Sequence, residues 1–395
     1  MTKVLCIYHA NCADGLGAAW AVHRALGDGV EFVAASYGDM PYHPAECSSN
    51  CDIPDCPYIH KSGWDFEIAG RDILIVDFSY TLPVLRAMAT EARSVLVLDH
   101  HKTAREDLAS LPPPCTTGIP NDPKTPTPWE CWLEYGAIHK MEDIINSGRP
   151  PFRLAAIFDM ERSGAGIVWD YLHPAPQRDL RMENRPRIID LIEDRDLWRF
   201  RYEDSRPFHA VLSSYDWTDL LAMFRRLSNW QLWYEHRDDH DYWNGIIDEG
   251  RAILRAQQQD VAATVRATRR TMRIADHVVP VANVSPSMAS EAGHLLCQEN
   301  YTASNMEFVT GFPQERYSFA ATYHDGSDGR RHFSLRSPKG GADVGEIAKR
   351  MAVEFNEIAS DKRYVHHLQY QGKTWTGGGH EHAAGFDAPL GWEGE

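Results

Sequence analysis

The sequence has no apolar run that approaches the roughly 18 residues of a membrane-spanning helix. Its first apolar run, Val4 to Tyr8, is too short for the core of a secretory signal. Cysteine is scarce, with 8 residues in 395, which argues against a disulfide scaffold and favours free thiols or metal ligands. We therefore expect a cytoplasmic protein that does not bind membranes.

Basic residues are in deficit as well. The chain has 40 Lys and Arg against 56 Asp and Glu, a net charge of -16. Binding along long nucleic acid depends on cationic side chains that neutralise phosphates, so this composition argues against long duplex DNA as a partner. Short anionic substrates are still compatible with it if bound metal ions supply positive charge locally.

Three short aliphatic runs in the first hundred residues each end at a polar residue that can bind metal. Continuous apolar runs of this kind are typical of strands buried on both faces of a parallel sheet. Because the carboxyl ends of parallel strands share one edge, we expect these polar residues to converge there. The runs are Val4 to Tyr8 before His9, Ile73 to Val76 before Asp77, and Val95 to Leu98 before Asp99, His100 and His101.

The length exceeds the roughly 100 to 200 residues of one domain, so we predict a two-lobed α/β protein. Residues 1–204 are expected to form a parallel-sheet domain with insertions near 39–70 and 105–150. Residues 205–277 are helical in pattern and highly charged, which indicates a solvated helical connector. Residues 278–395 are expected to form a smaller α/β domain. Its predicted strands are residues 278–284, 308–312, 318–323 and 332–335.

The polar residues at the predicted sheet edge are mostly imidazoles and carboxylates. This mixture suits divalent transition ions such as Mn²⁺. A carboxylate that lies between two ions can bridge them, and we expect Asp77 to do so. The candidate ligands are His9, Asp14, Asp77, His100 and one carboxylate of the pair Asp194 and Asp196.

Four motifs, in order along the chain, together resemble the DHH phosphoesterase superfamily with its associated C-terminal GGGH domain. The resemblance covers roughly residues 1–200 and 278–390. Two further segments, Ser334 to Ser337 and Asp343 to Ala348, also resemble that C-terminal domain. The motifs are Tyr8-His-Ala-Asn-Cys-Ala-Asp-Gly-Leu-Gly-Ala-Ala19, Val76-Asp-Phe-Ser79, Leu98-Asp-His-His101 and Gly377-Gly-Gly-His-Glu-His-Ala-Ala-Gly-Phe386.

The resemblance implies a metal-dependent phosphoesterase, usually activated by Mn²⁺, with Mg²⁺ as an alternative. Among the ligands, His9 would bind one ion and Asp14 the other. Asp77 would bridge, and His100 with a later carboxylate would complete the ligands of the second ion. For that carboxylate we prefer Asp194, because an aromatic residue follows four positions later as in similar relatives, and Asp196 is the alternative.

The same resemblance implies catalytic roles for two neighbouring residues. His101 would face the substrate phosphate or the attacking water. Asp99 would orient one of the adjacent imidazoles by a hydrogen bond.

One position departs from the family pattern. Many relatives carry a second Asp where this chain has Cys12, with Asn11 beside it. Either the first ion is held by His9, Asp77 and a softer or neutral ligand, or only one ion binds tightly. The sequence leaves the number of ions open.

The glycine-rich motif of the second domain predicts a phosphate-binding loop. Gly377, Gly378 and Gly379 let backbone N–H groups approach a phosphate, and a helix that begins near His382 would add its positive end. His380 and Arg336 would contact the phosphate directly, Arg336 through its planar guanidinium group. The alternative is a structural turn before a helix.

The first insertion contains enough ligands for a structural zinc site. Cys47, Cys51 and Cys56 could bind Zn²⁺ together with His43 or His60. Their spacing is not that of a standard CxxC pair. Free thiols in an exposed loop are therefore the alternative.

Together these features predict hydrolysis of phosphodiester bonds in short oligonucleotides or dinucleotides by metal-activated water. The expected partner is a short single-stranded nucleic acid or dinucleotide, and a homodimer is compatible with the sequence. One alternative is an inorganic pyrophosphatase, against which the GGGH motif argues. Another is a nucleotide-binding sensor with weakened catalysis, which Cys12 keeps open.

Overall fold

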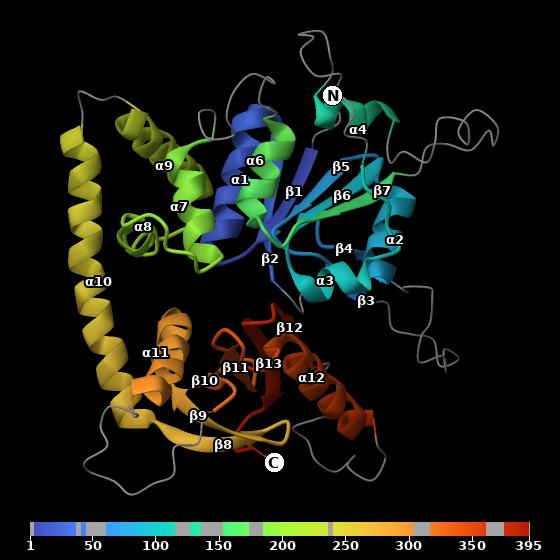
Figure 1. Ribbon diagram of the computed structural model, residues 1–395. Helices are drawn as coiled ribbons and strands as arrows, with labels where there is room; N and C mark the ends of the chain where they lie inside the picture. Colours follow the sequence, from blue (N-terminus) through green and yellow to red (C-terminus); the bar gives the residue numbers. More distant parts are fainter. Residues whose placement is uncertain are drawn as a thin grey trace, which may run out of the picture. The chain divides into compact units, whose positions relative to one another are not determined.

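A computed structural model describes residues 4–36, 41–44, 61–114, 127–135, 153–173, 185–235, 240–302, 317–360 and 375–394. The chain forms two compact units, Met1–Ile253 and Leu254–Glu395 (Figure 1). The first contains a parallel sheet followed by helices, and the second contains a mixed sheet, which confirms the predicted α/β class. The predicted domain boundaries after residues 204 and 277 stay predictions. No helix among the described residues is long and apolar enough to cross a membrane.

The sheet of the first unit has five parallel strands in the order β2-β1-β5-β6-β7. Chain order reverses at β1, so a switch point lies between β1 and β5, where ligands of open α/β sheets commonly bind. The strands are β1 (Val4–His9), β2 (Val30–Ala35), β5 (Asp72–Val76), β6 (Ser94–Asp99) and β7 (Leu154–Phe158). A separate two-stranded sheet pairs β3 (Tyr42–Pro44) with β4 (Lys61–Trp64).

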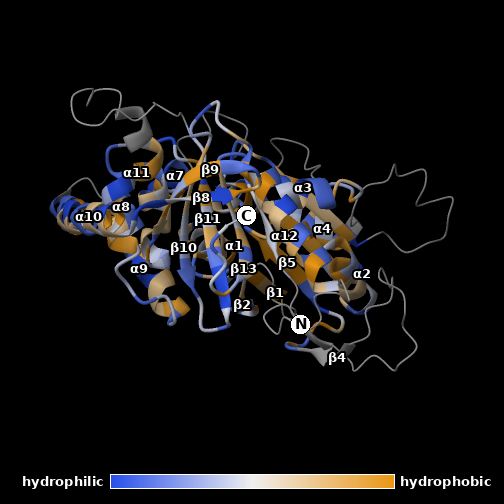
Figure 2. Cartoon of the chain, turned by 90° about the horizontal axis from the view of Figure 1, so that it is seen from below, coloured by the Kyte–Doolittle hydropathy of each residue, from blue (hydrophilic) through white to orange (hydrophobic). Residues whose placement is uncertain are grey.

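Side chains of this sheet alternate between two hydrophobic cores. In β5, Leu74 and Val76 face one core, whereas Ile73 and Ile75 face the other. Both faces are thus buried, which is the physical reason for the continuous apolar runs in the sequence. The orange colour of β5 in Figure 2 reflects this composition. The first core includes α1 (Ala13–Leu26), α6 (Gly164–Leu172) and α7 (Arg187–Asp196), and the second includes α2 (Leu82–Glu91). Two further helices are α3 (Lys102–Asp107) and α4 (Pro128–Tyr135).

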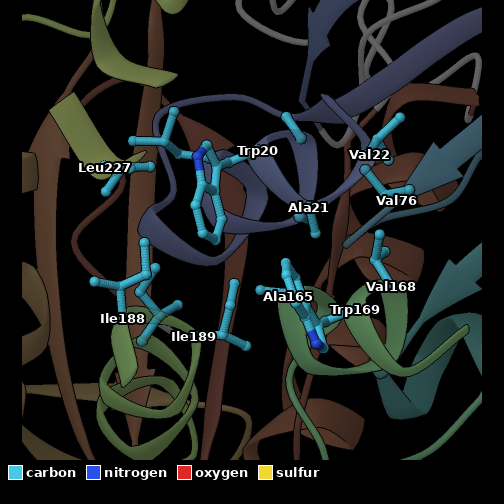
Figure 3. Close-up of a cluster of buried hydrophobic side chains, with 14 of the residues drawn as sticks. Trp20, Ala21, Val22, Val76, Ala165, Val168, Trp169, Ile188, Ile189 and Leu227 are labelled. Atoms are coloured by element: carbon cyan, nitrogen blue, oxygen red, sulfur yellow. The ribbon is translucent and has the colours of Figure 1, made fainter. Parts of the chain in front are cut away.

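Small residues let α1, α6 and α7 pack closely (Figure 3). A Cβ at Gly17 of α1 would lie only 2.9 Å from Cδ1 of Ile192 and 3.1 Å from Cβ of Ala165. Next to this contact, Trp20 stacks on Trp169 with ring centroids 5.8 Å apart. Close helix packing at this point fixes the amino ends of α1 and α6 relative to the sheet.

Helices α8 (Ser205–Leu212) and α9 (Leu220–Glu235) and the first half of α10 (His240–Thr268) are part of the first unit's core, and the boundary between the two units falls within α10. In α9, Phe224, Leu227 and Trp230 are buried in the same core as α1. The solvated connector expected here therefore has a buried face along α9. Helix also ends earlier than expected, because residues 270–274 form strand β8 (Arg270–Ile274).

The second unit has a six-stranded sheet in the order β12-β13-β11-β10-β9-β8. All pairs are antiparallel except β9 with β10. Residues 308–312, a predicted strand, lie outside the described residues. The remaining elements are β9 (His277–Asn283), α11 (Ala289–Thr302), β10 (Ala320–Asp325), β11 (Arg330–Arg336), α12 (Val344–Ser360), β12 (Gly377–Gly379) and β13 (Ala383–Pro389), with short 3-10 turns at Gly27–Gly29 and Pro286–Met288.

The buried face of α9 can be tested with two leucines of the same helix. Leu227 is 0% exposed, whereas Leu232 is 46% exposed. We expect Leu227→Ala to lower the free energy of unfolding by about 2–5 kcal/mol, because it opens a cavity in the core. Leu232→Ala should change it by less than about 0.5 kcal/mol. Denaturant unfolding followed by circular dichroism measures both, and equal effects would contradict the packing of α9.

Candidate metal centre

The ends of three parallel strands bring imidazole and carboxylate groups together. His9 ends β1, Asp77 follows β5, and His100 follows β6. His9 Nδ1 lies 3.6 Å from Asp77 Oδ2, and His100 Nε2 lies 3.2 Å from Asp77 Oδ1. One carboxylate thus presents a different oxygen to each of two imidazoles.

Asp77 is unusual both in its backbone and in its side chain. Its φ is 61°, a left-handed conformation that is uncommon for a residue with a Cβ and is often found at functional sites. Asp77 is 1% exposed, and neither carboxylate oxygen accepts a hydrogen bond of acceptable geometry from the described residues. Burial alone would raise the pKa of Asp77, but the imidazoles of His100 and His9 outweigh it and hold that pKa well below its usual range.

Asp14 reaches the same point from the first turn of α1. It is buried, and its two oxygens accept hydrogen bonds from the N–H groups of Gly164 (2.5 Å) and Ala165 (3.0 Å), at the start of α6. A helix N-terminus stabilises a negative charge placed there. His100 Nε2 lies 3.7 Å from Asp14 Oδ2. Burial, together with the charges of Asp77 and Asp196, raises the pKa of Asp14 well above its usual value.

The two histidines after β6 face different partners. His101 Nδ1 donates a 2.7 Å hydrogen bond to Asp99 Oδ1, which also accepts from the backbone N–H of His100 at 2.7 Å. Asp99 therefore orients the His101 ring. His100 is surrounded by carboxylates instead: burial lowers its pKa, but Asp77, Asp196 and Asp14 outweigh burial and raise that pKa to about 10.

The preferred later ligand, Asp194, is not part of this cluster. Its carboxylate accepts hydrogen bonds from the N–H groups of Arg201 and Tyr202 and from the Ser205 hydroxyl, so it holds the loop after α7. Asp196, the alternative, places Oδ2 3.6 Å from His100 Nε2. Asp14, His100 and Asp196 have ligand atoms within 4.8 Å of one another. The geometry thus favours Asp196 over Asp194 as the candidate ligand.

Cys12 lies near Asp77 and His9. Potential ligand atoms of His9, Cys12 and Asp77 also fall within 4.8 Å of one another. Burial, followed by the charges of Asp77, Asp196 and Asp14, raises the pKa of the Cys12 thiol well above its usual value. The two groups of three ligands join at Asp77, which contacts both His9 and His100. This donor set fits divalent cations, because buried carboxylate oxygens face imidazole nitrogens and a thiol.

Glycine at position 164 is required by this arrangement. A Cβ on Gly164 would lie 2.6 Å from both Cβ and Oδ1 of Asp77. Reasoning from the sequence assigned Gly164 and Ala165 no part in the site. The signal for them was the run of small residues Ser163-Gly-Ala-Gly166, where the Ser163 hydroxyl caps the helix by accepting from the Gly166 N–H at 3.2 Å.

The glycine motif of the second unit forms a hairpin, not a loop before a helix. Gly377–Gly379 is strand β12, and Ala383–Pro389 is strand β13, so the helix expected near His382 is absent from these residues. A Cβ on Gly377 would lie 2.1 Å from the Ala348 carbonyl oxygen, because the hairpin packs tightly against α12. The structural-turn alternative thus accounts for this glycine, although the turn precedes a strand.

Arg336 and the hairpin share one end of the second sheet. Arg336 pairs with Ala383 in the β11–β13 ladder, and the backbone N–H of His380 donates to the Ala383 carbonyl at 2.8 Å. The Arg336 guanidinium donates to the Ser334 hydroxyl and the Leu335 carbonyl. Of the residues predicted to bind a phosphate in this domain, Gly379 and His380 thus lie near Arg336, whereas Gly377 pairs farther along β13, with Phe386.

The predicted zinc site falls outside the part of the chain that the structure describes. This applies to Cys47, Cys51, Cys56 and His60, and only the backbone of His43 is described, in β3.

The chain was compared with known protein families, curated proteins and solved structures. No family model matches the chain. Two solved structures align with nearly the whole chain, both at low sequence identity and low structural similarity. One is a DHH-domain protein of a ribosomal-protein family; the match covers 98% of this chain and 82% of that protein, with 12% identity and a TM-score of 0.41. The match to a structure of the exonuclease RecJ bound to manganese covers 98% of this chain and 86% of that protein, with 14% identity and a TM-score of 0.36.

A curated relative is an uncharacterized protein of Acanthamoeba polyphaga mimivirus, 22% identical over 358 residues. The match spans 87% of this chain but 63% of that protein, less than two thirds of its length.

The close contact at Gly164 gives a test of the centre. We expect Gly164→Ala to lower the affinity for Mn²⁺ by more than about tenfold, because the added methyl group would displace the Asp77 carboxylate. The control is Gly245→Ala in α10, where a Cβ would meet nothing within 4 Å and affinity should not change. Isothermal titration calorimetry measures both. Unchanged affinity in the Gly164 variant would contradict the placement of Asp77 in a metal site.

Proposed function

We propose that this protein is a metal-dependent phosphoesterase that hydrolyses phosphodiester bonds in short oligonucleotides or dinucleotides. The observation that carries the proposal is the carboxylate of Asp77, which is buried between His9 and His100 and accepts no hydrogen bond of acceptable geometry from the described residues. When both imidazoles are neutral, as metal ligands are, a cation would have to compensate this buried charge. Asp14 and Asp196 add further negative charge at the same point, which favours divalent ions.

In this proposal His9, Cys12 and Asp77 hold one ion, and Asp14, Asp77, His100 and Asp196 hold a second. When bound, the ions supply Lewis acidity that activates water and neutralises charge on a phosphoryl group. Mn²⁺ is the preferred ion because a mixture of carboxylate and imidazole ligands suits it. Mg²⁺ is the alternative.

His101 and Asp99 are proposed to act on the substrate. His101 is partly exposed, with 15% of its side chain accessible, whereas Asp99 is fully buried beneath it. The hydrogen bond from Nδ1 to Asp99 fixes the ring, so Nε2 is the nitrogen that would meet a phosphoryl oxygen or deliver a proton to the leaving group. Asp99 acts through His101 and is a positioning residue.

The second unit is proposed to bind a phosphate group of the substrate. Arg336 and the backbone of Gly377 to His380 would contact a phosphate there. The net charge of the chain is -16, so short substrates are favoured over long duplexes.

The test is release of nucleoside monophosphate by the full chain with Mn²⁺. We expect release from dinucleotides and short single-stranded oligomers and none of phosphate from pyrophosphate. Asp77→Ala should reduce the rate by at least about 100-fold, since it removes the shared ligand. Arg336→Ala should mainly raise KM. Turnover of pyrophosphate alone would favour the pyrophosphatase alternative, and metal binding without turnover of any substrate would favour the sensor.

The choice between two acidic residues of α7 gives a second test. Asp196→Asn should lower the affinity for Mn²⁺ by about tenfold or more and leave unfolding nearly unchanged, because the residue lies at the cluster. Asp194→Asn should instead lower the free energy of unfolding by about 1–3 kcal/mol, because its charged hydrogen bonds hold the loop of residues 199–205. Calorimetric metal titration and denaturant unfolding of both variants separate the roles, and a reversed pattern would restore Asp194 as the ligand.

A further inference from the structure

We infer that Cys12 is a thiolate ligand that makes the ion site on the His9 side selective for a thiophilic cation, Zn²⁺ or Co²⁺, over Mn²⁺. The inference deepens the proposed function and rests on it, because it concerns one of the two ions of the same centre. It predicts a centre whose two sites prefer different metals.

The backbone brings the Cys12 sulfur to the site. Asn11 has a left-handed φ of 54°, which turns the chain sharply between β1 and α1. A Cβ on Gly15 would lie 2.2 Å from the His9 carbonyl oxygen, so the first turn of α1 lies directly against the end of β1. Cys12 is therefore held beside His9, and its Sγ is within 4.8 Å of ligand atoms of both His9 and Asp77.

Helix capping is a weak reason for a cysteine at this position. Cys12 is the N-cap of α1, and the Gly15 N–H acts on its thiol, but the side chain makes no capping hydrogen bond of acceptable geometry. Ser163, the N-cap of α6 in the same unit, does make one with the Gly166 N–H. Serine, threonine, aspartate and asparagine are the usual caps, and a thiol is a poor substitute for them.

The Asp77 carboxylate, which lies near Cys12, is a further reason to expect a cation. The Asp77 oxygens are buried and accept no hydrogen bond of acceptable geometry from the described residues. The Cys12 thiol lies near them but is only a weak donor. A metal ion held by sulfur, imidazole and carboxylate would compensate the buried charge of Asp77. The three ligand atoms and the buried Asp77 carboxylate thus indicate the same ion.

The chemistry of the ligands separates the two sites. Thiolate and imidazole ligands with one carboxylate are typical of zinc, and thiolate sulfur discriminates against Mn²⁺. The neighbouring group of Asp14, His100 and Asp196 contains only nitrogen and oxygen ligands, which suit Mn²⁺ or Mg²⁺. An Asp at position 12 would make the two sites alike, and Cys12 makes them different.

Titration of the metal-free full chain with Co²⁺ tests the inference directly. A cobalt–thiolate bond gives a charge-transfer band in the near ultraviolet, which we expect for the protein and not for Cys12→Ser or Cys12→Asp. Because Cys47, Cys51 and Cys56 could produce the same band, these three are replaced by Ser in the background. Cys297→Ser, in the second unit, is the matched thiol control and should retain the band. A band that persists in both Cys12 variants would overturn the inference.

Metal preference is the second readout. In Cys12→Asp, which keeps a charged ligand, the ratio of Zn²⁺ to Mn²⁺ affinity should fall by at least about tenfold. An unchanged ratio would overturn the inference. Hydrolysis measured on the same samples separates the two proposals: turnover without the band would refute the role of Cys12 and keep the function. The band without turnover of any substrate would keep the cysteine ligand and refute the function.

Discussion

The structure of the first unit depends on one constraint: several carboxylates are buried at one edge of the sheet, and the charge of each must be compensated. Asp14, Asp77 and Asp99 are each 1% exposed or less. Burial of a charge without compensation costs many kcal/mol, so each needs a partner. Asp14 has the amide groups that begin α6, and Asp99 has His101 and two backbone N–H groups. Asp77 has no backbone N–H donor among the described residues; its partners are the imidazoles of His100 and His9, which are themselves candidate metal ligands.

The surrounding packing follows from the same constraint. Gly164 leaves room for the Asp77 carboxylate, and Gly15 lets α1 reach the end of β1. Asp77 itself adopts a left-handed backbone that most residues avoid. The close packing of α1, α6 and α7, with Trp20 stacked on Trp169, holds these features in place. Helices α8 and α9 complete that core, so residues far from the site help to fix it.

The glycine motif of the second unit is explained by packing and backbone conformation. Gly377 has no space for a side chain because the hairpin packs on α12, and Gly379 has a φ of 140° that favours glycine. These facts explain the glycines without any ligand. Phosphate binding at this hairpin stays a prediction, which depends on Arg336 lying beside it.

The parallel sheet, the strand ends and most of the residues gathered there could be predicted from the order of amino acids alone. Buried strands require continuous apolar runs, and the polar residues that end those runs meet because parallel strands share one edge. The choice between Asp194 and Asp196 required the folded chain. The two lie two positions apart on α7, and a helix turns about 100° per residue, so their side chains leave the axis in nearly opposite directions. Which direction faces the site depends on how α7 packs against α1 and α6. The surroundings of the Asp77 carboxylate and the position of the Cys12 sulfur beside it also required the folded chain, because contacts between distant segments depend on packing.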